Sequence, residues 1–249
     1  MEQQNRTPQH TWQLDPWTET KTILDRLTIQ KPDTDASEKR GPHWLGQIAA
    51  LANLIPQFFN VVHQFERTFS QYQEDLILNE IFRYKGTTNE FVVDIGAGDG
   101  IRISNSLFFR QLGWNSLLVD GNPGKVGKKQ GVQKHWITLE NINSILEKNN
   151  VPKEMDLLSL DIDGNDYWIL EKILANYKPR VIVVEINGAY GESDDYMPYK
   201  EDYNHKKEQN PLHGQSIPAA IRLGKENGYV PVCKIRGTNL ILIREDLDK

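Results

Sequence analysis

From about residue 70 onward, short apolar runs alternate with amphipathic segments. The apolar runs are rich in β-branched and aliphatic residues, as strands buried on both faces are. Between them, apolar residues recur at helical spacing. Strands are predicted at 91–95, 116–119, 135–138, 155–160, 180–186, 229–235 and 240–244. Helices are predicted at 70–84, 104–112, 141–149, 166–177 and 216–227.

This alternation predicts an α/β fold in which a mostly parallel sheet of seven strands carries helices on both faces. The last two strands form a hairpin around 236–239, which adds an antiparallel edge strand. Ser70 and Gln73 are spaced as a capping box for the first helix, and Ser216 caps the last one. The polar stretch 188–213 interrupts the pattern, and a loop of this length in a compact domain is usually functional.

The N-terminal part of the chain differs from the rest in composition. Residues 1–66 are interpreted as an N-terminal extension, partly flexible and then helical, and residues 67–249 as the α/β domain. Within 43–65, apolar residues at helical spacing favour docking onto the core. Alternatively, this segment caps the substrate side or forms a dimer surface. A peripheral membrane contact has weak support, because Lys and Arg are scarce there.

Overall composition narrows the class of protein. The 249 residues carry a formal net charge of −5, which disfavours broad electrostatic binding to nucleic acid. The single cysteine, Cys233, excludes an internal disulfide framework, and we expect it to pack in the core. The N-terminus lacks a signal pattern, and no apolar run reaches the ~18 residues of a membrane span. We therefore expect a cytoplasmic protein. A homo-oligomer is compatible with this composition.

The stretch 91–100 carries the strongest chemical signal. A buried strand ends in Asp94, and glycines follow at positions 96, 98 and 100. A dinucleotide fingerprint requires a third glycine at the position of Ile101. The observed D-x-G-x-G-x-G pattern is instead typical of S-adenosylmethionine-dependent methyltransferases, whose cationic cofactor favours nearby acids. Dinucleotide binding and a turn without a ligand remain the alternatives.

Several further motifs resemble those of the FkbM-type methyltransferases, over roughly residues 69–187. They are Ser70-Gln71-x-x-Glu74-Asp75, the Asp94-x-Gly96-Ala97 core, Ser104-Asn105, and Asp161-Ile162-Asp163-Gly164-Asn165-Asp166. The chain departs from the family at Asp163, which replaces Glu, and at Asp120-Gly121, which replaces a common E-P pair. The resemblance implies a Rossmann-like class I methyltransferase fold. It also implies O-methylation of a small molecule such as a sugar or a glycosylated metabolite.

The predicted cofactor residues lie at the ends of the first two strands and beside them. They are Gln71, Asp94, Gly96, Ala97, Gly98, Asp99, Asn105, Asp120 and Gly121. Asp120 can accept hydrogen bonds from the ribose hydroxyls, although an Asp before Gly also starts turns. Residues 138–141 are a weaker candidate for the adenine contact.

The predicted catalytic residues are Asp161, Asp163 and His213. A hydroxyl acceptor must lose its proton to a general base, or to water after a metal has lowered its pKa. Asp161 and Glu185 end neighbouring strands and are the predicted ligands of Mg²⁺. These acids could instead only orient the cationic cofactor, and Asp166 is most simply a helix cap.

Two other functions fit the pattern less well. One is a non-catalytic S-adenosylmethionine-binding or partner subunit that uses 43–65 as its interaction face; intact glycine and acid motifs disfavour it. The other is a dehydrogenase. The leading prediction is a methyltransferase that acts on a small-molecule acceptor and has no nucleic-acid partner.

Overall fold

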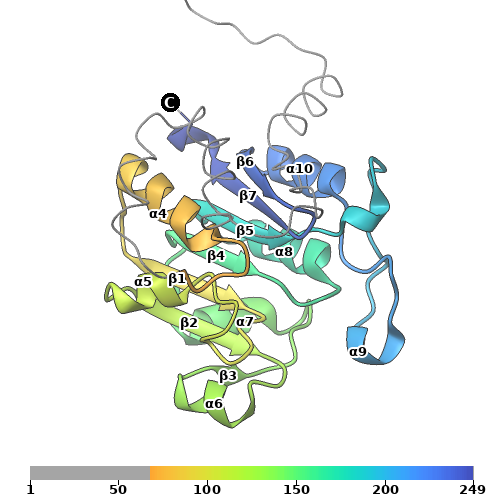
Figure 1. Cartoon of the computed structure of the whole chain (residues 1–249), viewed down its shortest axis with the longest axis horizontal. Helices are drawn as coiled ribbons and strands as arrows, with labels where there is room; N and C mark the ends of the chain where they lie inside the picture. Colours follow the sequence, from red (N-terminus) through yellow and green to blue (C-terminus); the bar gives the residue numbers. More distant parts are fainter. Residues whose placement is uncertain (1–67, 249) are drawn as a thin grey trace, which may run out of the picture.

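The computed structural model describes residues 68–248, which fold around one seven-stranded sheet (Figure 1). The strand order is β3-β2-β1-β4-β5-β7-β6. The strands are β1 Phe91–Ile95, β2 Asn115–Asp120, β3 Gln133–Lys134, β4 Leu157–Leu160, β5 Val181–Glu185, β6 Tyr229–Ile235 and β7 Asn239–Arg244. The α-helices are α4 Glu74–Lys85, α5 Leu107–Gln111, α6 Gly124–Lys129, α7 Ile142–Lys148, α8 Asp166–Leu174, α9 His205–Glu208 and α10 Ile217–Glu226. Two 3₁₀ helices are η1 Gly188–Tyr190 and η2 Glu245–Leu247.

Strand directions confirm the predicted fold class. β3, β2, β1, β4 and β5 pair in parallel, and β7 pairs antiparallel with both β5 and β6. The strand that runs in the opposite direction is therefore β7, one place in from the edge, and β6 forms the edge itself. The parallel strands all end at one edge of the sheet, where ligands of such folds bind.

Two hydrophobic clusters cover the two faces of the sheet. Along β5, Ile182 and Val184 face the cluster that includes α7, α8 and α10, whereas Val181 and Val183 face the cluster that includes α4 and α5. Alternation along a buried strand sends successive side chains to opposite faces. Apolar layers on both sides explain why the central strands are continuous apolar runs.

The third strand lies earlier in the chain than predicted. β3 is Gln133–Lys134, whereas the apolar pattern indicated 135–138. After His135 donates its backbone N–H to the Asp120 carbonyl, the chain turns away from the sheet. The Asn141 side chain holds that turn by donating to the Trp136 carbonyl and accepting from the Thr138 N–H. Hydrogen bonding of the turn thus overrides the local strand propensity.

The predicted capping box of the first helix is wrong. α4 begins at Glu74, and the residue before it, Gln73, has φ 71° and makes no side-chain cap. The Ser70 hydroxyl donates to the Asp75 carboxylate and accepts from the Asp75 N–H. Asp75 also accepts from the Phe69 N–H at 2.7 Å. Ser70 therefore fixes the loop before the helix and accepts one N–H of the first helical turn, whereas Gln73 makes no reciprocal hydrogen bond. The predicted Ser216 cap is confirmed: its side chain accepts from the Ala219 N–H.

The long polar segment 188–213 packs against the domain. The ring of Tyr196 stacks on Tyr167 of α8 with centroids 3.7 Å apart, and Trp168 donates its indole N–H to the Met197 carbonyl. Further along, Asn165 donates to the Lys200 carbonyl. Aromatic stacking and these hydrogen bonds fold the segment back toward the strand ends.

Other predictions concern the core and the N-terminal part. Cys233 is buried in the core, as expected. Between residues 68 and 248, no helix has the length and apolar character needed to cross a bilayer. The interpretations of 1–66 and of the apolar stretch 43–65 fall outside the described residues.

Candidate functional site

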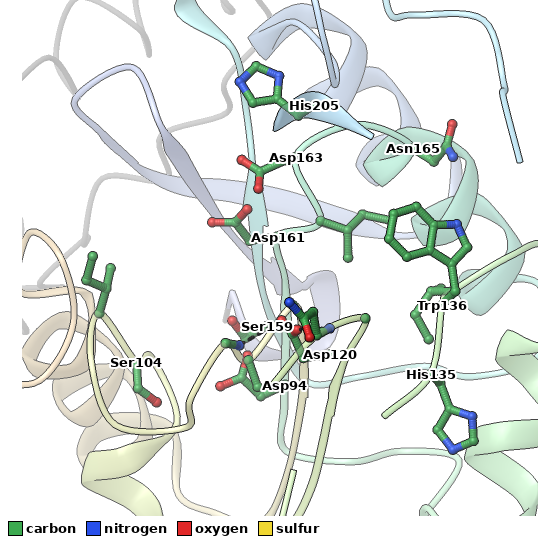
Figure 2. A pocket seen from close by; sticks show the side chains of 18 of the residues that line it. Asp94, Ser104, Asp120, His135, Trp136, Ser159, Asp161, Asp163, Asn165 and His205 are labelled. Atoms are coloured by element: carbon green, nitrogen blue, oxygen red, sulfur yellow. Dashed lines mark hydrogen bonds between the residues drawn. The ribbon is translucent and has the colours of Figure 1, made fainter. Parts of the chain in front are cut away.

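A cavity of about 440 Å³ opens at the carboxyl ends of β1, β2 and β4 (Figure 2). Its volume is within the usual range for small-molecule sites. Eight of the nine predicted cofactor residues line it, namely Gln71, Asp94, Gly96, Ala97, Gly98, Asn105, Asp120 and Gly121. Asp161 and Asp163 line it as well, at the side next to His205. The structure therefore brings most of the predicted site together in one place.

The glycine turn forms the floor of this cavity through its backbone. Gly96 has φ 86°, and a Cβ at this position would overlap the carbonyl oxygen of Asp161. The Gly96 N–H donates to the Val119 carbonyl of β2, at 2.9 Å. Only a residue without a side chain fits between these two strand ends. The turn thus requires glycine for close approach as well as for its dihedral angles.

Asp94 is a buried acid at the end of β1. The Ser106 hydroxyl donates to its carboxylate at 2.6 Å. Burial raises the pKa of Asp94 to about 6, against the lowering effect of Ser106, Ser159 and the charge of Arg110. Ser159 in turn accepts from the Asn105 side chain at 3.1 Å. Asp94 therefore presents a titratable negative charge to the cavity near neutral pH.

Asp120 contributes to the turn and to the cavity. Its carboxylate accepts from the Gly98 N–H at 2.9 Å and from the Asn122 N–H at 2.6 Å. These bonds fit the turn-forming role that sequence reasoning kept as an alternative. Each carboxylate oxygen can accept a second hydrogen bond, so these contacts leave the predicted ribose role open.

Asp99 is the predicted cofactor residue that the structure places elsewhere. It does not line the cavity. Its carboxylate accepts from the Ile101 and Arg102 backbone N–H groups and pairs with the Arg102 side chain at 2.7 Å. These hydrogen bonds lower the pKa of Asp99 to about 2. The Asp99 side chain therefore stabilises the end of the glycine turn, on the side away from the cavity.

Four acids gather where β4 and β5 end. Leu160 pairs with Val184, so Asp161 and Glu185 follow on adjacent strands. Enclosure by the cavity wall raises the pKa of Asp161, and the charges of Asp166 and Asp163 raise it further. Its side chain is still exposed to the open cavity, so water offsets part of this effect.

Glu185 is more enclosed than Asp161. Burial and then the charge of Asp161 raise the pKa of Glu185 well above its ordinary value. The role of Asp166 differs from the predicted helix cap: its carboxylate accepts from the Ile162 and Gly164 N–H groups, which precede α8. Asp166 therefore shapes the loop that carries Asp163.

His213 reaches this cluster from the end of the long segment. Its Nε2 lies 3.8 Å from Glu185 Oε1, and its Nδ1 lies 3.0 Å from the Asn210 carbonyl oxygen. His213 does not line the cavity, although its ring lies 4.1 Å from that of His205, which does. Among the described residues, the group whose ligand atoms could hold a metal is Asp163, Glu185 and His213. Of the predicted metal ligands it contains Glu185 and lacks Asp161.

Sequence reasoning missed the far wall of the cavity. His135, Trp136 and Ile137 line it, whereas the predicted adenine contacts at 138–141 do not. Trp136 is 47 % exposed and donates its indole N–H to the Glu201 carbonyl. A Cβ at Gly121 would lie 2.9 Å from the Trp136 ring. The misplaced third strand hid this wall, since it assigned Trp136 to a strand interior.

Comparison with known proteins gives one family match. The model of the methyltransferase FkbM domain matches residues 129–229. A search of curated proteins found no match. This domain match confirms the resemblance that the motifs indicated.

Solved structures with a similar arrangement include three methyltransferases. One is the Burkholderia thailandensis 1,6-didemethyltoxoflavin-N1-methyltransferase, with 13 % identity, a TM-score of 0.41, and coverage of 86 % of this chain and 96 % of that one. Another is an O-methyltransferase from Bacillus cereus, with 12 % identity, a TM-score of 0.43, and coverage of 79 % and 96 %. The third is the Synechocystis magnesium protoporphyrin IX methyltransferase, with 10 % identity, a TM-score of 0.38, and coverage of 94 % and 99 %.

Proposed function

We propose that this chain, in which residues 129–229 match the methyltransferase FkbM domain, transfers a methyl group from S-adenosylmethionine to a hydroxyl of a small molecule. One observation carries the proposal. A single cavity joins the glycine turn after β1 to the acids that end β1, β2 and β4. A nucleoside with a cationic amino-acid tail fits such a cavity, since it needs close backbone approach at one end and negative charge at the other.

The nucleoside end is assigned to the wall beside β2. Asp120 would accept from the ribose hydroxyls, and the exposed face of Trp136 would stack on adenine. Gly121 allows the Trp136 ring to approach the chain after β2, because a Cβ there would lie 2.9 Å from that ring. This replaces the predicted adenine contact at 138–141 with residues that line the cavity.

The methionyl end is assigned to the wall formed by β1 and the loop before α4. Asp94 supplies negative charge for the ammonium group, while Gln71 and Asn105 offer amide groups to its polar end. Ser106 and Ser159 hold Asp94 in place. When bound, S-adenosylmethionine would supply the methyl group from its cationic sulfur. The acceptor oxygen would gain the methyl group and lose its proton, and S-adenosylhomocysteine would be the leaving group.

We assign Asp161 as the general base that accepts the proton of the acceptor hydroxyl. It ends β4, its side chain faces the open cavity, and its backbone packs against Gly96 of the cofactor turn (Figure 2). The acceptor would enter past Asp163 and His205, which line the same side. A sugar or a glycosylated metabolite suits this side, because carboxylates and amides there can hydrogen-bond several hydroxyls.

A divalent cation is the other route to an activated hydroxyl. Asp161 and Glu185, the ligands expected for Mg²⁺, would supply only two carboxylates. Both residues lie at the ends of β4 and β5, on the side assigned to the acceptor, so a cation there would bind apart from the cofactor.

Calorimetric titration with S-adenosylhomocysteine and with NAD⁺ tests the proposal. We expect saturable one-to-one binding of S-adenosylhomocysteine and none of NAD⁺. Transfer of a labelled methyl group to a panel of glycosides then tests the acceptor class. Binding of NAD⁺ alone would reject the methyltransferase assignment, and cofactor binding without any transfer would favour a non-catalytic subunit.

A further inference from the structure

We propose that Asp163, Glu185 and His213 form a binding site for a divalent first-row transition-metal cation at the acceptor side of the cavity. The three residues come from the loop after β4, the end of β5 and the end of the long segment before α10. Cation binding does not depend on the proposed methyl transfer, so the two can be tested separately.

The spacing of the three side chains suits a shared cation. One ligand atom from each lies within 4.8 Å of the others, and Glu185 Oε1 is 3.8 Å from His213 Nε2. That separation is too long for a hydrogen bond. It matches two ligands of one cation, which lie roughly 3–4 Å apart when each is about 2.0–2.2 Å from the metal. Small side-chain rotations would bring Asp163 to the same spacing.

The hydrogen bond of His213 prepares its other nitrogen for a metal. Nδ1 lies 3.0 Å from the carbonyl oxygen of Asn210, which can only accept, and 3.4 Å from the Asn187 side-chain nitrogen. The shorter contact favours the tautomer in which Nδ1 carries the proton, because the Asn187 amide already donates to the Pro211 and His213 carbonyls. Nε2 then has a free lone pair on the side of Glu185. Metal-binding histidines usually donate their other ring N–H to a carbonyl or carboxylate in this way.

The neighbour that shares a side-chain hydrogen bond with Glu185 is another acid, Asp161, so it supplies no positive charge. Oε2 of Glu185 is buried and accepts no hydrogen bond among the described residues. In residues 68–248, the only basic group within ion-pair distance of Asp163 or Glu185 is His213, at 3.8 Å. A buried oxygen without a donor is costly unless a cation or water satisfies it.

Backbone conformation supports the role of Asp163. Its φ is 56°, in the left-handed region that L-residues other than Asn and Asp rarely adopt. Asp166 holds that conformation through the Ile162 and Gly164 N–H groups. Because Asp163 lines the cavity and the other two ligands do not, a cation would face the acceptor through Asp163.

The donor set decides the kind of cation. One imidazole with two carboxylates suits Mn²⁺, Fe²⁺ or Zn²⁺, whereas Mg²⁺ prefers oxygen ligands alone. The site therefore differs in ligands and in metal from the Mg²⁺ pair expected from the sequence. Mn²⁺ is the practical probe, because its electron paramagnetic resonance signal reports binding directly.

The experiment titrates Mn²⁺ into the full chain after treatment with chelator and dialysis. We expect one Mn²⁺ per chain. Affinity should fall in each of Asp163→Asn, Glu185→Gln and His213→Asn by at least the roughly 10- to 100-fold that is lost when a residue orienting a ligand is replaced. Asn tolerates the left-handed backbone of Asp163, so that variant should fold. The control is His135→Asn, a cavity histidine on the far side from Asp163, which should bind like the wild type (Figure 2).

Two results would overturn the proposal: no stoichiometric Mn²⁺ in the wild type, or equal affinity in the wild type and in all three variants. Thermal unfolding identifies any variant that fails to fold, and the remaining variants then carry the test. Titration of S-adenosylhomocysteine into the same samples separates a failure of the metal site from a failure of the proposed function. Mn²⁺ binding without cofactor binding would leave the metal site supported and the methyltransferase assignment rejected.

Discussion

Gly96 and Asp161 pack backbone to backbone, so that a Cβ on Gly96 would overlap the Asp161 carbonyl oxygen. This contact joins the turn assigned to the cofactor with the strand end assigned to the acceptor. A methyl group must pass from one to the other over a short distance, since the reacting atoms have to lie about 3–3.5 Å apart. The absence of a side chain at position 96 allows the two regions to adjoin.

Substitution Gly96→Ala should therefore damage both stability and binding. The new methyl group must displace the backbone of Asp161, and φ 86° is unfavourable for alanine. We expect a loss of more than about 2 kcal/mol in denaturant unfolding and no measurable S-adenosylhomocysteine binding. The matched control is Gly113→Ala, at φ 94° with open space around it, which should cost about 1 kcal/mol and keep binding. Equal effects of the two substitutions would show that backbone strain alone matters.

The sequence predicts the parts of the site that continuous apolar runs position. The strand before Asp94 and the strand before Asp161 are buried on both faces, so their apolar runs and ends are visible in the sequence. Parallel order then places both ends at one edge of the sheet. Eight predicted cofactor residues line the cavity for this reason.

The remaining parts depend on contacts without a local pattern. β3 has only two residues, too few for any periodicity, and so the placement of Trp136 could not be derived. His213 reaches Glu185 because the stacking of Tyr196 on Tyr167 folds the long segment back. No spacing rule encodes such a long-range stacking contact, although the length of the polar segment indicated a functional loop.

Asp94 should make stability and cofactor affinity respond to pH in opposite ways. Its pKa of about 6 lies above the ordinary value of 3.8. The folded state therefore holds more protons than the unfolded state between about pH 4 and 6, and the free energy of unfolding falls as pH rises through that window. Affinity for S-adenosylmethionine should rise over the same window, because the ionised carboxylate attracts the ammonium group.

The variant Asp94→Asn separates these two effects. It keeps an acceptor for Ser106 but cannot ionise. At pH 7 we expect it to be about 1–3 kcal/mol more stable than the wild type and to bind S-adenosylmethionine about 10- to 100-fold more weakly. At pH 4 the two proteins should have similar stability. Chemical denaturation and calorimetry at both pH values provide the measurements, and wild-type affinity at pH 7 would argue against the role of Asp94.

The ion pair between Asp156 and Arg180 should stabilise the fold without affecting the site. The two charged groups are 2.7 Å apart and almost fully buried. Burial alone would raise the pKa of Asp156, but hydrogen bonds from Arg180 and from the backbone N–H groups of Thr88, Asn89 and Glu90 lower it below 3.8. This contribution is present above pH 3.8 and is lost as the pH falls through the lowered pKa.

Removing one partner leaves the other charge buried. Asp156→Ala should therefore cost about 3–5 kcal/mol in the free energy of unfolding at pH 7. The matched control is Asp246→Ala, which breaks the exposed pair with Arg244, also at 2.7 Å, and should cost less than about 1 kcal/mol. S-adenosylhomocysteine affinity, measured on folded protein, should be unchanged in both variants. A similar small cost for both would mean that burial of the Asp156 pair contributes little.

Trp136 should determine affinity for the adenine ring. Its side chain lines the cavity, and its indole N–H is bonded to the Glu201 carbonyl at 2.8 Å. Trp136→Ala removes the stacking surface and should weaken S-adenosylhomocysteine binding about 10- to 100-fold, in line with base–aromatic stacking energies of ~1–3 kcal/mol. Trp136→Phe keeps a smaller aromatic face and loses the hydrogen bond, so it should retain more affinity than the Ala variant in the same calorimetric titration. If the Phe variant binds as weakly as the Ala variant, Trp136 acts by anchoring the segment at Glu201, and the adenine contact lies elsewhere in the cavity.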